Sequence, residues 1–198
     1  AYLGLNALAG APEPPPQEEA VAILAFALAA VPTALLAVLL VRLLLPIAGE
    51  PWALFMGAAF GLGTIAFPFA TMLFGHALSA FALFAAFFLL NRWRRTGGSW
   101  QPVAAGMLGG LAVMTEVPVA LGVVVLGVWA LVLGWRVAAR LVLGGLPLAL
   151  VFGGYNLVTF GSPFSLGYQY STLFVEQNAT GIVSIVWPSL DRFLDLML

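Results

Sequence analysis

Glu116 is the residue whose position most strongly suggests chemistry. It separates two apolar stretches, and Pro118 follows it closely. A carboxylate at membrane depth is costly and by default indicates a functional site or a paired charge. Such a group could bind a metal ion, act as a general base or accept hydrogen bonds from sugar hydroxyls. The structural alternative is an interfacial carboxylate near the start of a helix at Pro118, where the helix dipole favours an anion.

His76 is the only histidine of the chain. One histidine cannot supply a multi-histidine metal site, and such a residue commonly caps a helix or makes a structural hydrogen bond. A histidine near neutrality can also pair with an anion such as a phosphate. Ligation of a chlorophyll-type magnesium ion is a third interpretation, and all three stay open on the sequence.

Residues 155–170 combine three of the four tyrosines with amide and hydroxyl side chains. Tyrosines just outside a membrane span are typical of an interfacial aromatic belt, and Gly-Ser-Pro is typical of a turn. The belt does not account for the density of amides and hydroxyls. A surface for carbohydrate or lipid head groups would use both, with aromatic faces for stacking and amides for hydrogen bonds. The candidate binding residues here are Tyr155, Asn156, Tyr168 and Gln169.

The composition determines the solvent in which these residues act. Of 198 residues, 63% are hydrophobic and 8% charged, whereas soluble domains are about a quarter charged. Apolar stretches recur along the whole chain, which predicts an all-α polytopic transmembrane bundle in the lipid bilayer. The net charge of -1 excludes the electrostatic footprint of a nucleic-acid-binding protein. The absence of cysteine excludes disulfides and thiolate chemistry.

About 20 apolar residues are needed to cross a bilayer, and the hydropathy pattern predicts about six spans. Pro32 is expected to kink the first span, and Pro46 to end it. Gly61, Gly63 and Pro68 predict that the second span is tilted or broken. The spans are expected at 20–45, 52–65, 70–90, two short helices within 103–134 that meet near Glu116, and 137–158.

The basic residues predict the orientation of these spans. With the N-terminal linker outside, six of the seven basic residues fall on the inner side, as the positive-inside rule requires. Those six are Arg42, Arg92, Arg94, Arg95, Arg136 and Arg140. This topology places His76, Glu116 and the tyrosine-rich segment together at one outer site.

The predicted organisation has three parts, and both ends of the sequence resemble cut edges of a longer chain. Residues 1–19 form an outer Pro-rich linker, 20–158 the transmembrane core, and 159–198 an outer loop with the start of an amphipathic helix. We expect residues 155–188 to form an ordered outer cap, because their aromatic side chains would be poorly placed in water. Glycines such as Gly106, Gly109 and Gly110 are expected to allow close helix packing.

Three stretches, taken in order, resemble bacterial polytopic glycosyltransferases of the C-type superfamily, related to protein O-mannosyltransferases. The first runs from Leu62-Gly63-Thr64 through Phe67-Pro68-Phe69 to Leu73-Phe74-Gly75-His76-Ala77-Leu78. The second is Gly110 to Pro118, similar to a stretch with glycine, apolar residues, Thr-Glu, an aromatic residue and proline. The third is Tyr155-Asn156 with Phe160-Gly161-Ser162-Pro163 and Gly167-Tyr168. Phe69 and Val117 depart from the tyrosine and aromatic residue that the family often has there.

The resemblance implies a membrane enzyme, with the bacterial inner membrane as its expected location, that transfers a sugar from a polyprenyl-phosphate donor on the outer face. In this superfamily an acidic residue in the first outer loop is usually the base and sometimes a metal ligand. The chain is expected to be partial, lacking that first helix and loop, so a divalent metal is expected only in the full-length enzyme. Within this sequence, Glu116 is the catalytic candidate, and His76, Tyr155, Asn156, Tyr168 and Gln169 are the substrate-binding candidates.

Two alternatives from other classes remain. A non-catalytic transmembrane subunit, packed against other subunits of a larger membrane complex, would need no catalytic loop. A transporter half would need an intramembrane charge pathway, of which Glu116 is the single visible element.

Overall fold

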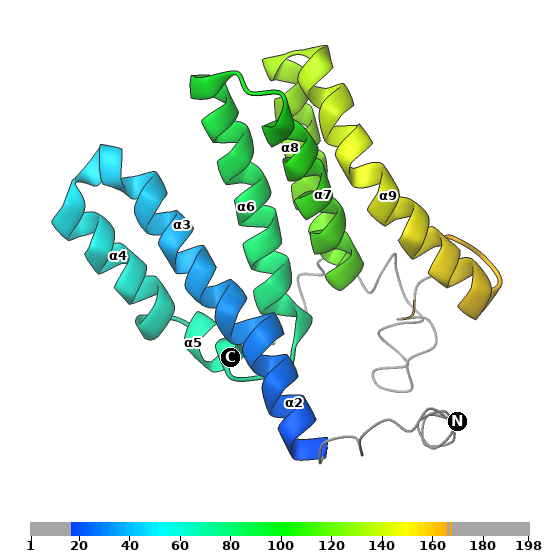
Figure 1. Ribbon diagram of the computed structural model, residues 1–198, viewed down its shortest axis with the longest axis horizontal. Coiled ribbons are helices and arrows are strands. Elements are labelled where there is room, and N and C mark those ends of the chain that lie inside the picture. Colours follow the sequence, from blue (N-terminus) through cyan, green and yellow to red (C-terminus); the bar gives the residue numbers. More distant parts are fainter. Residues whose placement is uncertain (1–16, 166, 168–198) are drawn as a thin grey trace, which may run out of the picture. The chain divides into compact units, whose positions relative to one another are not determined.

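The computed structural model describes residues 17–165 and residue 167, and every regular element in this part of the chain is helical (Figure 1). The chain divides into two compact units, residues 1–88 and 89–198. Three helical stretches are long and apolar enough to cross a membrane, which is compatible with an integral membrane protein. They are Gln17–Ala48, Gly75–Thr96 and Trp135–Phe160.

The first long helix of unit 1 has three segments, α2 (Gln17–Ala25), the π-helical turn η1 (Phe26–Ala30) and α3 (Val31–Ala48). It begins inside the range assigned to the linker, with Glu18 and Glu19 in its first turn, where the helix dipole favours acids. The distortion expected at Pro32 takes the form of η1, just before that proline. Thr33 supports the distorted turn, because its Oγ1 donates a hydrogen bond to the carbonyl oxygen of Ala29 at 2.8 Å.

Pro46 does not end this helix, contrary to the sequence prediction. The helix continues to Ala48 and ends at Gly49, whose φ of 78° favours glycine. The next helix, α4 (Glu50–Gly63), begins directly after Gly49. Gly57 and Gly61 of α4 approach Val41 and Ala37 of α3, so the two helices form an antiparallel hairpin (Figure 1).

The second apolar stretch is broken, as the glycines and Pro68 predicted. Helix α4 ends at Gly63, and a short helix, α5 (Ala66–Ala70), follows it. Thr64 forms the joint, because its Oγ1 donates to the carbonyl oxygen of Phe60 at 2.7 Å and accepts from the backbone N–H of Ala66 at 3.2 Å.

Helix α6 (Gly75–Thr96) lies further along the chain than the predicted span 70–90. The residues before it form a turn in which the Thr71 hydroxyl donates to the carbonyl oxygen of Pro68 at 2.9 Å. The arginines that follow the predicted span occupy its last turns, with Arg94 and Arg95 in the final one. Positive charges are stabilised at the negative end of the helix dipole, so these polar residues extend the helix.

Unit 2 contains α7 (Trp100–Thr115), the 3-10 turn η2 (Val117–Val119), α8 (Ala120–Leu133) and α9 (Trp135–Phe160). The predicted break near Glu116 is confirmed, since that residue is extended, with φ of -144° and ψ of 102°. The last helix passes through Pro147 and ends at Gly161, which adopts a left-handed conformation.

Helices α7 and α9 pack in backbone contact, as expected for glycine-rich membrane helices. A Cβ atom added at Gly106 would overlap the carbonyl group of Leu141, and one added at Gly144 would overlap that of Val103. Gly110 lies against Leu148 further along the same interface, so the two helices run parallel. This interface holds the ends of α7 and α9 in a fixed relation, and the candidate site lies there.

Candidate functional site

A pocket of about 330 Å³ lies in unit 2, between the end of α7, η2 and the last turns of α9. We call it the α7–α9 pocket. Its polar lining comes from Thr115, Tyr155 and Asn156, and its apolar lining from Met114, Val117, Phe152 and Phe160, with Gly167 at its edge. The hydroxyl of Thr115 donates to the carbonyl oxygen of Leu111 at 2.8 Å, which leaves the oxygen able to accept a further hydrogen bond.

Asn156 is the most constrained polar residue of the pocket, being only 2% exposed. Its Nδ2 donates a hydrogen bond to the carbonyl oxygen of Pro163 at 3.4 Å. Pro163 also lies close to the backbone of Gly153, where an added Cβ would be 3.7 Å from its Cβ. The chain therefore folds back against α9 after Gly161. This is the start of the predicted cap, whose remainder lies outside the described residues.

Tyr155 is the exposed polar residue of the pocket, with 61% of its surface accessible. Its ring meets that of Phe160 edge to face, with 6.4 Å between centroids and 85° between planes. This contact fixes one edge of the tyrosine ring, while its exposure leaves area for another planar or amphipathic group.

Glu116 is half-buried and joins α7 to η2, but its own side chain does not line the pocket. Its backbone N–H donates to the carbonyl oxygen of Ala112 at 2.9 Å, and its own carbonyl accepts from Val119 at 3.1 Å. Both chain neighbours of Glu116, Thr115 and Val117, line the pocket. Glu116, Tyr155 and Asn156 therefore belong to the same end of unit 2.

An apolar cleft of about 610 Å³ adjoins the pocket within unit 2, between α7, α8 and α9. Met114 and Phe152 line both cavities, so the polar pocket lies at one end of the apolar cleft. Five glycines widen the cleft by exposing helix backbone. They are Gly106, Gly109, Gly110, Gly127 and Gly145.

His76 lies in unit 1, near the start of α6, and is therefore not in the unit that holds the α7–α9 pocket. Its ring packs edge to face with Phe69, at 5.2 Å and 79°, and lies nearly parallel to Phe74, at 6.0 Å and 13°. It lines a separate cavity of about 300 Å³, together with the hydroxyl-bearing Thr33 and Thr64 and several apolar side chains. The described ring contacts of His76 are therefore with Phe69 and Phe74, within unit 1.

Two candidate binding residues, Tyr168 and Gln169, lie outside the described residues, as does the predicted amphipathic segment near the C-terminus. Within the described ranges, no group of three or more His, Asp or Glu side chains could hold a metal ion.

Sequence reasoning missed the apolar half of this site. Phe152, Tyr155 and Asn156 lie on one face of α9 because they are spaced three and four residues apart. That spacing was readable in the sequence, but the facing residues Met114 and Thr115 could be paired with it only from the helix packing. Comparison of the chain with known protein families, curated proteins and solved structures finds no match.

Proposed function

We propose that this chain is the core of a multi-pass membrane glycosyltransferase that uses a polyprenyl-phosphate sugar donor. The observation that carries the proposal is the continuity of the apolar cleft with the α7–α9 pocket. A polyprenyl-phosphate sugar has the same division, with a long apolar chain and a polar head group. The cleft accommodates part of the chain, and Thr115, Tyr155 and Asn156 meet the sugar.

The proposed reaction uses Glu116 as the general base. Its carboxylate takes the proton from an acceptor hydroxyl as that oxygen attacks the anomeric carbon of the donor. A new glycosidic C–O bond forms, the bond from the anomeric carbon to the phosphate oxygen breaks, and polyprenyl phosphate leaves with the electron pair. Tyr155 stacks against the sugar ring, and Asn156 holds the returning chain at Pro163 so that the pocket keeps its shape.

The multi-pass placement is supported by the charges at the helix ends. In unit 1, Arg42 lies near the end of α3, whereas Glu18 and Glu19 begin α2. In unit 2, Arg136 and Arg140 lie at the start of α9, and Glu116 lies beyond the end of α7. The proposal therefore puts the arginine ends inside and the α7–α9 pocket outside, with six helical passes. Three of these passes are the long helices, and the short helices α4, α7 and α8 make the other three.

The test uses the full-length protein in membranes with radiolabelled undecaprenyl-phosphate hexoses and pentoses as donors. Glu116→Gln should lower transfer by about 10²–10⁴-fold, the range for loss of a general base. Glu50→Gln is the matched control, because Glu50 begins α4 in unit 1 and should transfer normally. Normal transfer by Glu116→Gln, with expression equal to the parent, would refute Glu116 as the base.

One observation favours the alternative, a non-catalytic subunit of a membrane complex. Among the described residues of unit 2, no arginine lines the α7–α9 pocket: Arg136 and Arg140 lie at the opposite end of α9, and Arg92, Arg94 and Arg95 lie towards the end of α6. The discriminating measurement is photolabelling with a benzophenone polyprenyl-phosphate sugar. Labelling of α7 or α9 peptides supports the transferase, whereas absence of labelling with co-purification of a fixed partner supports the subunit.

A further inference from the structure

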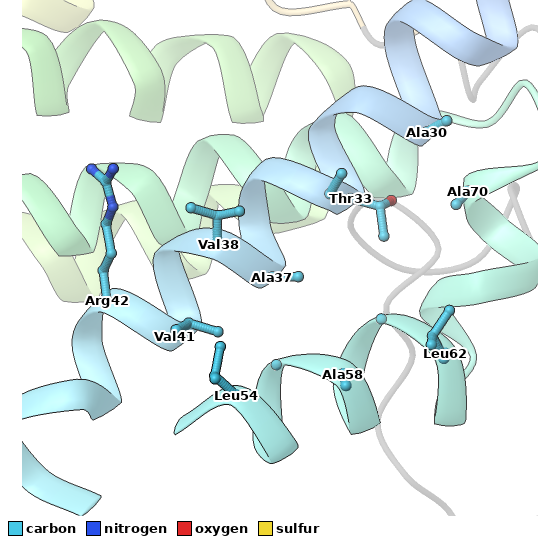
Figure 2. Close-up of a pocket in the computed structure, with 13 residues that line it drawn as sticks. Ala30, Thr33, Ala37, Val38, Val41, Arg42, Leu54, Ala58, Leu62 and Ala70 are labelled. Atoms are coloured by element: carbon cyan, nitrogen blue, oxygen red, sulfur yellow. The ribbon is translucent and has the colours of Figure 1, made fainter. Parts of the chain in front are cut away.

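A second apolar groove runs between α3 and α4 in unit 1, and none of its lining residues is assigned to sugar transfer. Its volume is about 620 Å³, and Figure 2 shows its lining. Small residues occur on both walls, and they add little side-chain volume to the space between the helices. They are Ala30, Ala34, Ala37, Gly57, Ala58 and Gly61.

The groove extends from Ala30, at the end of η1, to Arg42 of α3, which is 12 residue-to-residue steps. At 1.5 Å per residue this is about 18 Å. The hydrocarbon core of a bilayer is about 30 Å thick, so the groove is slightly longer than the depth of one leaflet. Its length therefore fits an acyl chain from a single leaflet.

Arg42 lines one end of this otherwise apolar groove. In Figure 2 its side chain leaves α3 near Val41 and Leu54, and its guanidinium points away from α4. Arg42 thus lines the end of the groove, while its exposed guanidinium is directed out of it. An arginine near a membrane surface attracts anionic lipid, and a guanidinium suits phosphate geometrically.

We infer that this groove binds one acyl chain of an anionic phospholipid of the inner leaflet, with its phosphate at Arg42. The inference rests on the proposed multi-pass placement, but not on glycosyl transfer. The small residues leave room for the acyl chain, and the length of the groove is close to the depth of one leaflet. The positive charge of Arg42 selects an anionic head group.

The test measures lipid selectivity at the groove through fluorescence quenching. The chain has no cysteine, so Leu54→Cys introduces a single site for a bimane label beside the groove. Leu131→Cys on α8 is the control label, because Leu131 is 60% exposed and does not line the apolar cleft. Both proteins are placed in vesicles of phosphatidylcholine and phosphatidylglycerol, with dibrominated chains on one lipid or the other.

Bimane at Leu54 should be quenched with about fivefold preference for brominated phosphatidylglycerol, the ratio expected for one basic residue near the surface. At Leu131, which is close in sequence to Arg136, any preference should be independent of Arg42. Arg42→Gln should abolish the preference at Leu54, whereas Arg42→Lys and the distant Arg94→Gln should retain it. Raising the salt concentration should weaken the preference in the unaltered groove, which tests the charge without a substitution at Arg42.

Three results would overturn the inference. They are a preference near unity at Leu54, an unchanged preference at Leu54 in Arg42→Gln, and no quenching at Leu54 by either lipid, which would mean that protein fills the groove. Absence of quenching at Leu131 as well would instead refute the membrane placement. Loss of selectivity with normal sugar transfer would overturn the lipid site and leave the proposed function intact.

Discussion

The glycines of the two units meet different neighbours across their helix pairs. In unit 2, Gly106 and Gly144 lie against the backbone carbonyls of Leu141 and Val103, so α7 and α9 are in backbone contact. In unit 1, Gly57 of α4 lies against the side chain of Val41 on α3, and small residues of both helices line a groove of about 620 Å³. Each unit therefore combines close helix contact with a cavity lined by small residues, since the apolar cleft of unit 2 is about 610 Å³. A glycine count alone does not distinguish the two outcomes.

The largest effect should come from the backbone contact in unit 2. Gly106→Ala and Gly144→Ala each place a methyl group onto a backbone carbonyl, which cannot move as a flexible side chain can. We expect each to lower the free energy of unfolding by about 3 kcal/mol or more. The measurement is an SDS titration in mixed micelles, followed by circular dichroism. Gly127→Ala is the control, since an added Cβ there meets nothing within 4 Å. Equal stability of all three variants would contradict the close contact.

The second effect concerns the buried amide at the α7–α9 pocket. Asn156→Leu removes the hydrogen bond to the Pro163 carbonyl, and we expect a loss of about 1–3 kcal/mol in the same titration. Tyr155→Phe is the neighbouring control, because the exposed hydroxyl should change stability by less than about 0.5 kcal/mol. If Asn156→Leu were as stable as the parent, the hydrogen bond from Asn156 to the Pro163 carbonyl would contribute nothing to the free energy of unfolding.

The third effect tests the one close contact in the unit 1 hairpin. A methyl group at Gly57 would overlap a methyl group of Val41, which is a side chain and not backbone. Gly57→Ala should therefore cost about 1 kcal/mol, less than either unit 2 glycine. Adding Val41→Ala should recover part of that loss, giving a favourable coupling in a double-mutant cycle. Strict additivity would mean that the two residues do not touch.

The smallest effect is expected to have the opposite sign. Gly61 faces Ala37, and an added Cβ would lie 3.8 Å from its Cβ, an ordinary contact distance. Gly61→Ala should stabilise the protein by up to about 1 kcal/mol, because alanine has the higher helix propensity. Destabilisation beyond about 1 kcal/mol would show that the groove is narrower than described.

The sequence predicted the breaks between helices better than their ends. Pro118 and Glu116 between two apolar stretches correctly predicted a joint, since proline and an extended residue interrupt backbone hydrogen bonding. Pro46 was misread as a terminator, because a proline in the last turn costs only hydrogen bonds that the helix end is about to lose. The third span was predicted to stop at residue 90, but the polar residues after it continue the helix to Thr96, with Arg94 and Arg95 in its last turn.

The candidate site was predictable residue by residue but not as an arrangement. Glu116, Tyr155 and Asn156 attract attention because polar groups are rare among apolar ones, and unit 2 brings their segments together. Nothing in the composition of α7 identifies α9 as its partner, because both are apolar and glycine-rich. The partner is fixed by which backbones can approach, and this depends on the three-dimensional register of Gly106 and Gly144.

The π-helical turn at Phe26–Ala30 sets how far α2 is rotated about the helix axis relative to α3. A π-helical turn holds one residue more than an α-helical turn, so everything before it is rotated by about 100° relative to a continuous α-helix. Deleting a single alanine from this turn would restore a continuous helix and move Glu18 and Glu19 to another face, without altering α3. The direction in which Glu18 and Glu19 point around the helix axis therefore depends on one residue in the π-helical turn. It can change without any change in the groove that α3 lines.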